Sequence, residues 1–135
     1  MSQQESNKSI VHRFFDEVFN GADESVIDQV IALEYRDHGS NPPLEGPTGA
    51  KNNFNGLMAG FSDVHFEIHE LIAEDDTVAA RWTGHMTHVN EWYGFKPTGK
   101  RISFSGNTFY RLHSGKIVEA HPAQDIFGLF NQLGS

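Results

Sequence analysis

The first part of the chain carries apolar side chains at intervals of three and four, the spacing of amphipathic helices. Asn20-Gly21 ends a first helix, because glycine readily adopts the left-handed conformation that follows a helix. Asp23 can start a second helix. Residues 48–61 predict a third helix, with a stripe of large apolar side chains. The apolar positions of the three helices are Ile10, Val11, Phe14, Phe15, Val18 and Phe19; Val26, Ile27, Val30 and Ile31; and Phe54, Leu57, Met58 and Phe61.

From residue 64 onward the apolar and polar positions alternate, which is typical of strands. Two long runs, 77–89 and 100–112, are joined by a segment rich in glycine and proline, and we expect them to be antiparallel neighbours. A last strand over 116–125 leads into a short apolar helix over 126–133. Helices followed by strands predict an α+β fold.

Three amphipathic helices and a meander of long strands predict a cone, in which a strongly curved antiparallel sheet wraps around the three N-terminal helices. Gly84 and Gly106 suit this curvature, because glycine marks bends and close backbone approaches. We expect one domain over residues 1–135, with the polar residues 1–8 disordered. Helices at one end of the cone leave the other end free to form an apolar cavity.

Strand parity predicts which side chains line that cavity. On the run 77–89 the more apolar set includes Trp82 and His88, which should therefore face inward. The corresponding set on the next run includes Phe104 and Tyr110. The expected substrate-binding side chains are Trp82, Phe104, Thr108, Tyr110, Phe14, Met58 and Trp92.

Asp125 is the strongest candidate for chemistry, because it ends the last strand next to aromatic residues. A carboxylate withdrawn from water can act as a general base near neutral pH. The same aspartate can instead cap the helix over 126–133, and the two roles are compatible. His38, His88 and His121 are candidates for a second acid, base or oxyanion donor. His121 and Asp125 lie about 13 Å apart along a strand, so they would flank a substrate rather than bond to each other.

Composition excludes several classes of function. The 135 residues carry a formal net charge of -8, which repels nucleic acids and anionic membrane surfaces. Cysteine is absent, which removes disulfides and thiolate chemistry. No glycine-rich phosphate loop or nucleophile elbow is present. The polar start and the lack of long apolar stretches lead us to expect a cytoplasmic protein.

Eight histidines raise the question of a metal. His65 and His69 are spaced too widely on one strand to share an ion easily, and His85 and His88 have opposite parity. We therefore predict no metal site and no cofactor.

A series of short segments, each weak alone, follows one order along nearly the whole chain: residues 14–21, 35–38, 72–78, 81–83, 87–88, 97–99, and 115–119 followed by Asp125. In this order they resemble the SnoaL-like polyketide cyclases, or ester cyclases, of the nuclear-transport-factor-like superfamily. The resemblance implies a cone-shaped, cystatin-like α+β fold, usually a homodimer. It also implies an intramolecular aldol closure of a polyketide methyl ester without a cofactor.

The same resemblance implies roles for individual residues. The family's acid/base aspartate falls on Asp125, and its Tyr-x-Asp-His and Thr-His segments bring His38 and His88 near the pocket. One departure concerns the last strand, where the family commonly has Glu-His-Trp and this chain has Glu119-Ala120-His121. An imidazole in place of the indole would make the pocket more polar.

Three functions are compatible with these observations. The first is an acid/base enzyme, a cyclase or isomerase, in which Asp125 removes a proton next to the carbonyl of a small hydrophobic compound. The second is an epoxide hydrolase or dehydratase, which would need Arg81 to point inward, although parity directs it outward. The third is a non-catalytic dimeric module that binds a small molecule, with Asp125 acting only as a cap.

Overall fold

The computed structural model describes residues 2–134, and within them the strands form one open, mixed sheet. The strand order is β2-β1-β6-β5-β4-β3. All neighbours are antiparallel except β1 and β6, which run parallel. The strands are β1 (Ile31–Asp37), β2 (Leu44–Glu45), β3 (Phe61–Glu74), β4 (Thr77–His88), β5 (Arg101–His113) and β6 (Lys116–Gln124).

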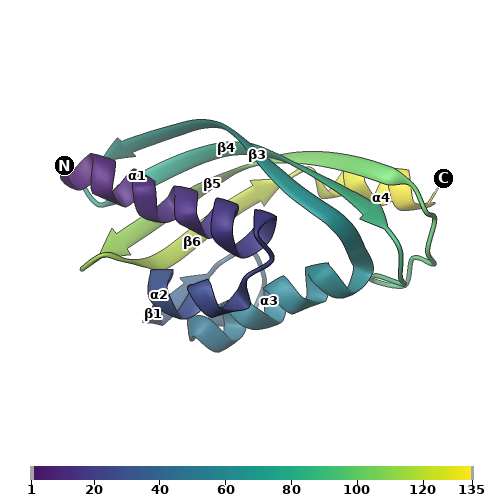
Figure 1. Cartoon of the computed structure of the whole chain (residues 1–135), viewed down its shortest axis with the longest axis horizontal. Helices are drawn as coiled ribbons and strands as arrows, with labels where there is room; N and C mark the ends of the chain where they lie inside the picture. Colours follow the sequence, from purple (N-terminus) through teal and green to yellow (C-terminus); the bar gives the residue numbers. More distant parts are fainter. Residues whose placement is uncertain (1, 135) are drawn as a thin grey trace.

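The helices cover one face of the sheet and one of its ends. Helix α1 (Gln3–Arg13) continues without a break into the π-helix η1 (Phe14–Asn20). The short 3-10 turn η2 (Glu24–Val26), α2 (Ile27–Val30) and α3 (Gly46–Gly60) follow, and α4 (Ile126–Gly134) closes the chain. Figure 1 shows the long strands curving over α1 and α3, with the two termini at opposite ends of the molecule. Within residues 2–134, no helix combines the length and apolarity needed to cross a lipid bilayer.

The α+β cone expected from the sequence is confirmed, with three corrections. The sheet is mixed rather than antiparallel, because β1 pairs in parallel with β6. The second predicted helix is only a turn long, since Ile31 already begins a strand. Disorder was expected for residues 1–8, and this is wrong for residues 3–8, which are helical. Residue 1 lies outside the described part of the chain. The Ser2 side chain accepts a hydrogen bond from the Glu5 amide and caps α1.

Aromatic side chains fill the space between the helices and the sheet. The Trp82 ring makes edge contacts with Phe66 and Phe104, at centroid distances of 5.4 Å and 5.6 Å. A side chain at Gly106 would collide with the Trp82 ring, so this glycine makes room for the indole. The buried rings of this core are Phe14, Phe15, Phe19, Tyr35, Phe54, Phe61, Phe66, Trp82, Phe104 and Tyr110. Burial of such rings contributes much of the folding free energy, at about 25 cal/mol per Å² of apolar surface.

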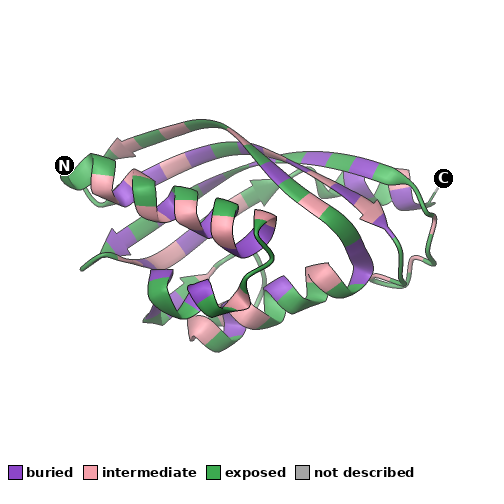
Figure 2. Cartoon of the chain, in the orientation of Figure 1, coloured by how far each residue is buried: buried purple, intermediate pink, exposed green. Residues whose placement is uncertain are grey.

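Burial alternates strictly along β4 and β5, so each has an inner face toward the helices and an outer face (Figure 2). Strand β6 departs from this alternation. Its register with β5 shifts between the pairs Leu112–Ile117 and Arg111–Glu119, which marks a bulge at residue 118. As a result Ile117 and Ala120 are both buried, and the odd-numbered residues from Glu119 onward face outward.

Candidate functional site

Three side chains form a row across the inner face of the sheet. Asp37 pairs with Ala120 across β1 and β6, and Ala120 pairs with Tyr110 across β6 and β5. Neighbouring strands lie about 4.8 Å apart, so the Cα atoms of Asp37 and Tyr110 are separated by about 10 Å. Because the residue between them is alanine, the carboxylate and the phenol can approach one another over a small methyl group.

Asp37 is half-buried at the end of β1, where the core meets the loop over 38–43. Its Oδ1 accepts a hydrogen bond of 2.8 Å from the Gly39 amide. Desolvation raises the pKa of Asp37, although the Gly39 amide and the nearby His38 and His121 act in the opposite direction. A carboxyl group with a raised pKa, at the edge of an aromatic interior, is characteristic of acid/base sites.

Two buried tyrosines, Tyr35 and Tyr110, lie on the same inner face as Asp37. Burial raises the pKa of Tyr35 and of Tyr110, and the charge of Asp37 adds to both shifts. Each phenol therefore stays protonated and can donate a hydrogen bond. Thr108 links this row to the aromatic core, because its Oγ1 accepts a hydrogen bond of 3.0 Å from Trp82 Nε1.

Asp125 does not project into the interior. It is exposed and caps α4, since its Oδ1 accepts a hydrogen bond of 2.9 Å from the Gly128 amide. The bulge in β6 turns it to the outer face, where it lines a groove of about 420 Å³ together with Arg81. The prediction that Asp125 enters a water-poor pocket is therefore wrong, whereas its predicted role as a cap is confirmed.

His88 lies on the inner face as parity predicts, with none of its surface exposed. Its Nδ1 accepts a hydrogen bond of 3.2 Å from the Thr98 amide, so the proton of the neutral ring resides on Nε2. This Nε2 is buried and has no partner among the described residues. Val78 pairs with Tyr110 and therefore continues the row that contains Asp37. His88 lies ten positions further along β4, or about 33 Å, so it cannot act on the same molecule as Asp37.

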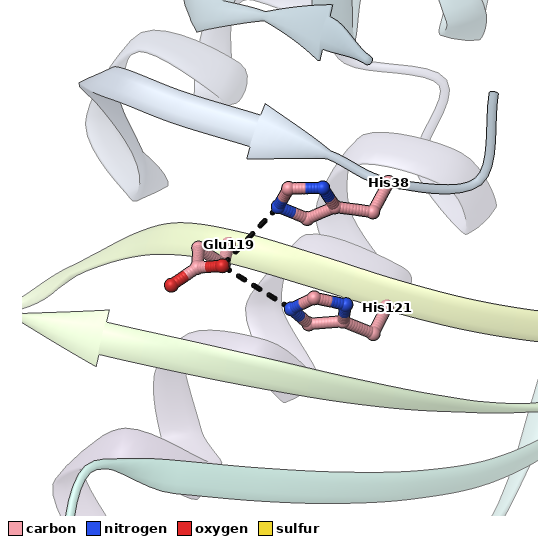
Figure 3. A group of neighbouring side chains, drawn as sticks. All are labelled: His38, Glu119 and His121. Carbon is pink, nitrogen blue, oxygen red and sulfur yellow. Dashed lines mark hydrogen bonds and ion pairs between the residues drawn. The ribbon is translucent and has the colours of Figure 1, made fainter. Parts of the chain in front are cut away.

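His38 and His121 meet on the outer face, where each Nε2 lies 3.2 Å from the same oxygen, Oε2 of Glu119 (Figure 3). Partial desolvation would raise the pKa of Glu119, but the hydrogen bond with His121, the charge of Arg111 and the hydrogen bond with His38 together lower it. The expectation that Asp125 and the candidate histidines converge on one aromatic cavity is therefore wrong: His38 and His121 gather around Glu119, and His88 lies apart from both.

Arg81 points outward, as parity predicts. Its Nε lies 2.8 Å from Glu70 Oε1, and both side chains are exposed. This position gives no support to an epoxide hydrolase, which would need the guanidinium inside the cone.

Comparison with known proteins adds independent information. The family model described as SnoaL-like polyketide cyclase matches residues 9–133. The chain belongs to this family. No match is found among curated proteins.

Solved structures resemble the SnoaL-like fold of this chain over nearly their whole length. A proposed polyketide cyclase from Acidithiobacillus ferrooxidans is 32% identical, with a TM-score of 0.84, covering 98% of this chain and 97% of that one. AclR, a proposed hydroxylase from Streptomyces galilaeus, is 25% identical, with a TM-score of 0.88 and 98% of each chain covered. A proposed SnoaL-like polyketide cyclase from Jannaschia has a TM-score of 0.90 at 20% identity, covering 100% of this chain and 96% of that one, and supports the fold alone.

The side chains predicted to bind substrate surround the SnoaL-like interior. Trp82, Phe104, Thr108, Tyr110 and Phe14 are buried, whereas Met58 and Trp92 are half-buried and pack against the core. Their contact with a substrate stays a prediction.

Sequence reasoning missed Asp37 as a candidate for chemistry. The segment Tyr35-Arg36-Asp37-His38 drew attention to its histidine and was expected to lead into a loop. If residues 31–37 are instead read as a strand, Tyr35 and Asp37 fall on one face and His38 on the other. That alternation was the available signal.

Proposed function

We propose that this chain is a cofactor-independent acid/base enzyme that acts on a small hydrophobic carbonyl compound, with Asp37 as the proton-accepting group. The observation that carries this proposal is the inner-face row, in which a half-buried carboxylate lies one alanine away from a buried phenol. Membership of the SnoaL-like polyketide cyclases supports the same class of reaction.

In the proposed step, the Asp37 carboxylate takes a proton from the carbon next to a carbonyl group. The electron pair of the broken C–H bond forms an enolate, whose oxygen accepts a hydrogen bond from the Tyr110 or Tyr35 hydroxyl. In a cyclase, the enolate carbon then attacks a second carbonyl of the same molecule, forming a carbon–carbon bond. The new alkoxide recovers the proton, so the reaction needs no cofactor.

Asp125 is the alternative base, as the family resemblance implies. A general base for a carbon acid works best where water is excluded, and the exposed capping position of Asp125 does not provide this. We therefore assign the proton transfer to Asp37 and the cap to Asp125.

A non-catalytic binding module is the competing function. The dense aromatic packing beneath Asp37, with Tyr110 and Trp82 each 5% exposed, favours this candidate, because a substrate needs room. In that case Asp37 would contribute polarity to a binding surface at the rim. The homodimer that the resemblance implies stays part of both proposals.

The test uses a nitrobenzisoxazole, an aromatic carbon acid whose deprotonation releases a coloured phenolate. We expect Asp37→Asn to lower the rate at least ten-fold, since it removes the basic group and keeps its size. Asp125→Asn is the matched control and should retain the wild-type rate. Loss of activity in the control alone would transfer the role to Asp125. A rate no faster than buffer for the wild type would favour the binding module.

A further inference from the structure

The outer face of the sheet holds a group of three potential metal ligands, outside the row that contains Asp37. His38, Glu119 and His121 offer one ligand atom each, and these atoms all lie within 4.8 Å of one another. Both Nε2 atoms approach Oε2 of Glu119 at 3.2 Å. Figure 3 shows the two imidazole rings side by side with these nitrogens turned toward the carboxylate. Their ring centroids are 4.4 Å apart, with an angle of 7° between the planes.

The backbone fixes this arrangement from two separate parts of the chain. Glu119 and His121 are two positions apart on β6 and therefore share its outer face. His38 directly follows the parallel strand β1, and its amide donates a hydrogen bond of 2.9 Å to the carbonyl of Ala120. Gly39 packs closely on Pro122, because a Cβ at this position would lie 2.6 Å from Pro122 Cγ. The turn that carries His38 is thus held against β6.

Two imidazole nitrogens and one carboxylate oxygen form a donor set that suits Zn²⁺ and related first-row ions better than Mg²⁺ or Ca²⁺. The imidazoles are about one-third and one-half exposed, with side-chain exposures of 32% and 54%, so an ion can reach them from solvent. The other carboxylate oxygen, Oε1, lies 3.3 Å from the Arg111 guanidinium. This contact leaves Oε2 as the oxygen for a single bond to the ion.

We propose that His38, Glu119 and His121 bind one divalent ion of the Zn²⁺ class, with the remaining coordination positions open to water or to a ligand. The ion would replace the two hydrogen bonds that Glu119 now shares with the imidazoles. A small rotation of each ring brings its lone pair toward a common point. The positive charge of Arg111 lies close by, so the site should bind less tightly than a structural zinc site with four ligands.

The proposal goes beyond the proposed function and does not depend on it. His38 is on the outer face, whereas Asp37 pairs with Ala120 on the inner face. The spacings that argued against a metal in the sequence concerned pairs of histidines within one strand. They miss this group because its third member, His38, comes from the turn after a different strand.

The experiment is a Zn²⁺ titration of the full chain, without an affinity tag, followed by calorimetry. We expect one ion per chain, and Mg²⁺ should give no heat. His121→Ala, His38→Ala and Glu119→Gln should each lower Zn²⁺ affinity at least ten-fold. Co²⁺ provides a second readout, because its visible absorption bands should appear in the wild type and vanish in His121→Ala.

A matched control lies elsewhere on the same face. His85 Nε2 and His69 Nδ1 flank Glu67 at 3.3 Å and 3.8 Å, so this group has the same residue types without the compact geometry. His85→Ala should leave Zn²⁺ affinity unchanged. The proposal is overturned if His85→Ala weakens binding as much as His121→Ala, or if the wild type binds no Zn²⁺. A circular dichroism spectrum identifies any variant that fails to fold. If a histidine variant does not fold, the Zn²⁺ affinity of Glu119→Gln, which preserves side-chain size, decides whether the site exists. Asp37→Asn in the carbon-acid assay tests the proposed reaction separately.

Discussion

Asp37 and Tyr110 face the same side of the sheet from strands that are not neighbours, with only Ala120 between them. This relationship depends on the parallel pairing of β1 with β6, which aligns the end of β1 with the C-terminal part of β5 across β6. It brings an acid and a hydrogen-bond donor together at the edge of the core. The enzymatic proposal rests on this row.

The first prediction concerns the donor. Tyr110→Phe should lower the rate of the carbon-acid reaction by about 100-fold, because it removes a hydrogen bond to the developing oxyanion. The free energy of unfolding should fall by only about 1 kcal/mol, since the ring stays and a single buried hydroxyl is lost. Steady-state kinetics and urea denaturation give the two values. A variant that is fully active would exclude Tyr110 as the donor.

The second prediction uses two glycines with opposite surroundings. Gly106→Ala should lower the free energy of unfolding by about 1–3 kcal/mol, because the new methyl group would collide with the Trp82 ring and lie 2.9 Å from the Ala123 carbonyl. Gly56 lies within α3, and a Cβ added there would have nothing within 4 Å. Gly56→Ala should therefore raise stability by about 0.5–1 kcal/mol. Equal effects in thermal denaturation would contradict the packing argument.

Local periodicity was enough to predict most elements of this fold. The apolar spacing of Ile10 to Phe19 corresponds to α1 and η1, and alternation identified the inner face of β4, including Trp82 and His88. Each of these patterns lies within a single helix or strand, so the amino-acid sequence alone is enough to detect it. The α+β class follows from their order along the chain.

The features that could not be predicted depend on contacts between distant segments. Strand β1 is stabilised by pairing with β6, which lies more than eighty residues later in the sequence. The apolar residues of β1 continue the spacing of the preceding helix, so its local sequence does not indicate a strand. The bulge at residue 118 has no signature in the sequence, yet it decides that His121 and Asp125 face outward. For this reason the architecture was predictable and the arrangement of the candidate site was not.

The third prediction separates the two roles of Asp125. Asp125→Ala should lower the free energy of unfolding by about 1 kcal/mol, because the Gly128 amide loses its acceptor at the start of α4. Asp125→Asn should have almost no effect, since asparagine caps helices about as well. Urea denaturation measures both. An equal loss for asparagine and alanine would show that the charge, rather than the cap, matters.

The fourth prediction concerns Asn20, which substitutes for a missing strand beside β3. Strand β3 is an edge of the sheet, and the Asn20 side chain bonds both backbone groups of Phe66. Its Nδ2 donates to the Phe66 carbonyl at 3.0 Å, and its Oδ1 accepts from the Phe66 amide at 2.6 Å. Asn20→Ala leaves both groups without a partner in a part-buried position. We expect the free energy of unfolding to fall by about 2–4 kcal/mol.

Asn53 on α3 provides the control, because its side chain is exposed. Asn53→Ala should leave stability unchanged or raise it slightly, since alanine favours helix. Hydrogen exchange adds a local readout: the Phe66 amide should exchange faster in Asn20→Ala and at the wild-type rate in Asn53→Ala. If the two variants unfold at the same urea concentration, the bonds to Phe66 contribute nothing measurable. In that case the packing of η1 against β3 is stabilised by aromatic contacts alone, such as the one between Phe19 and Phe66 at a centroid distance of 5.2 Å.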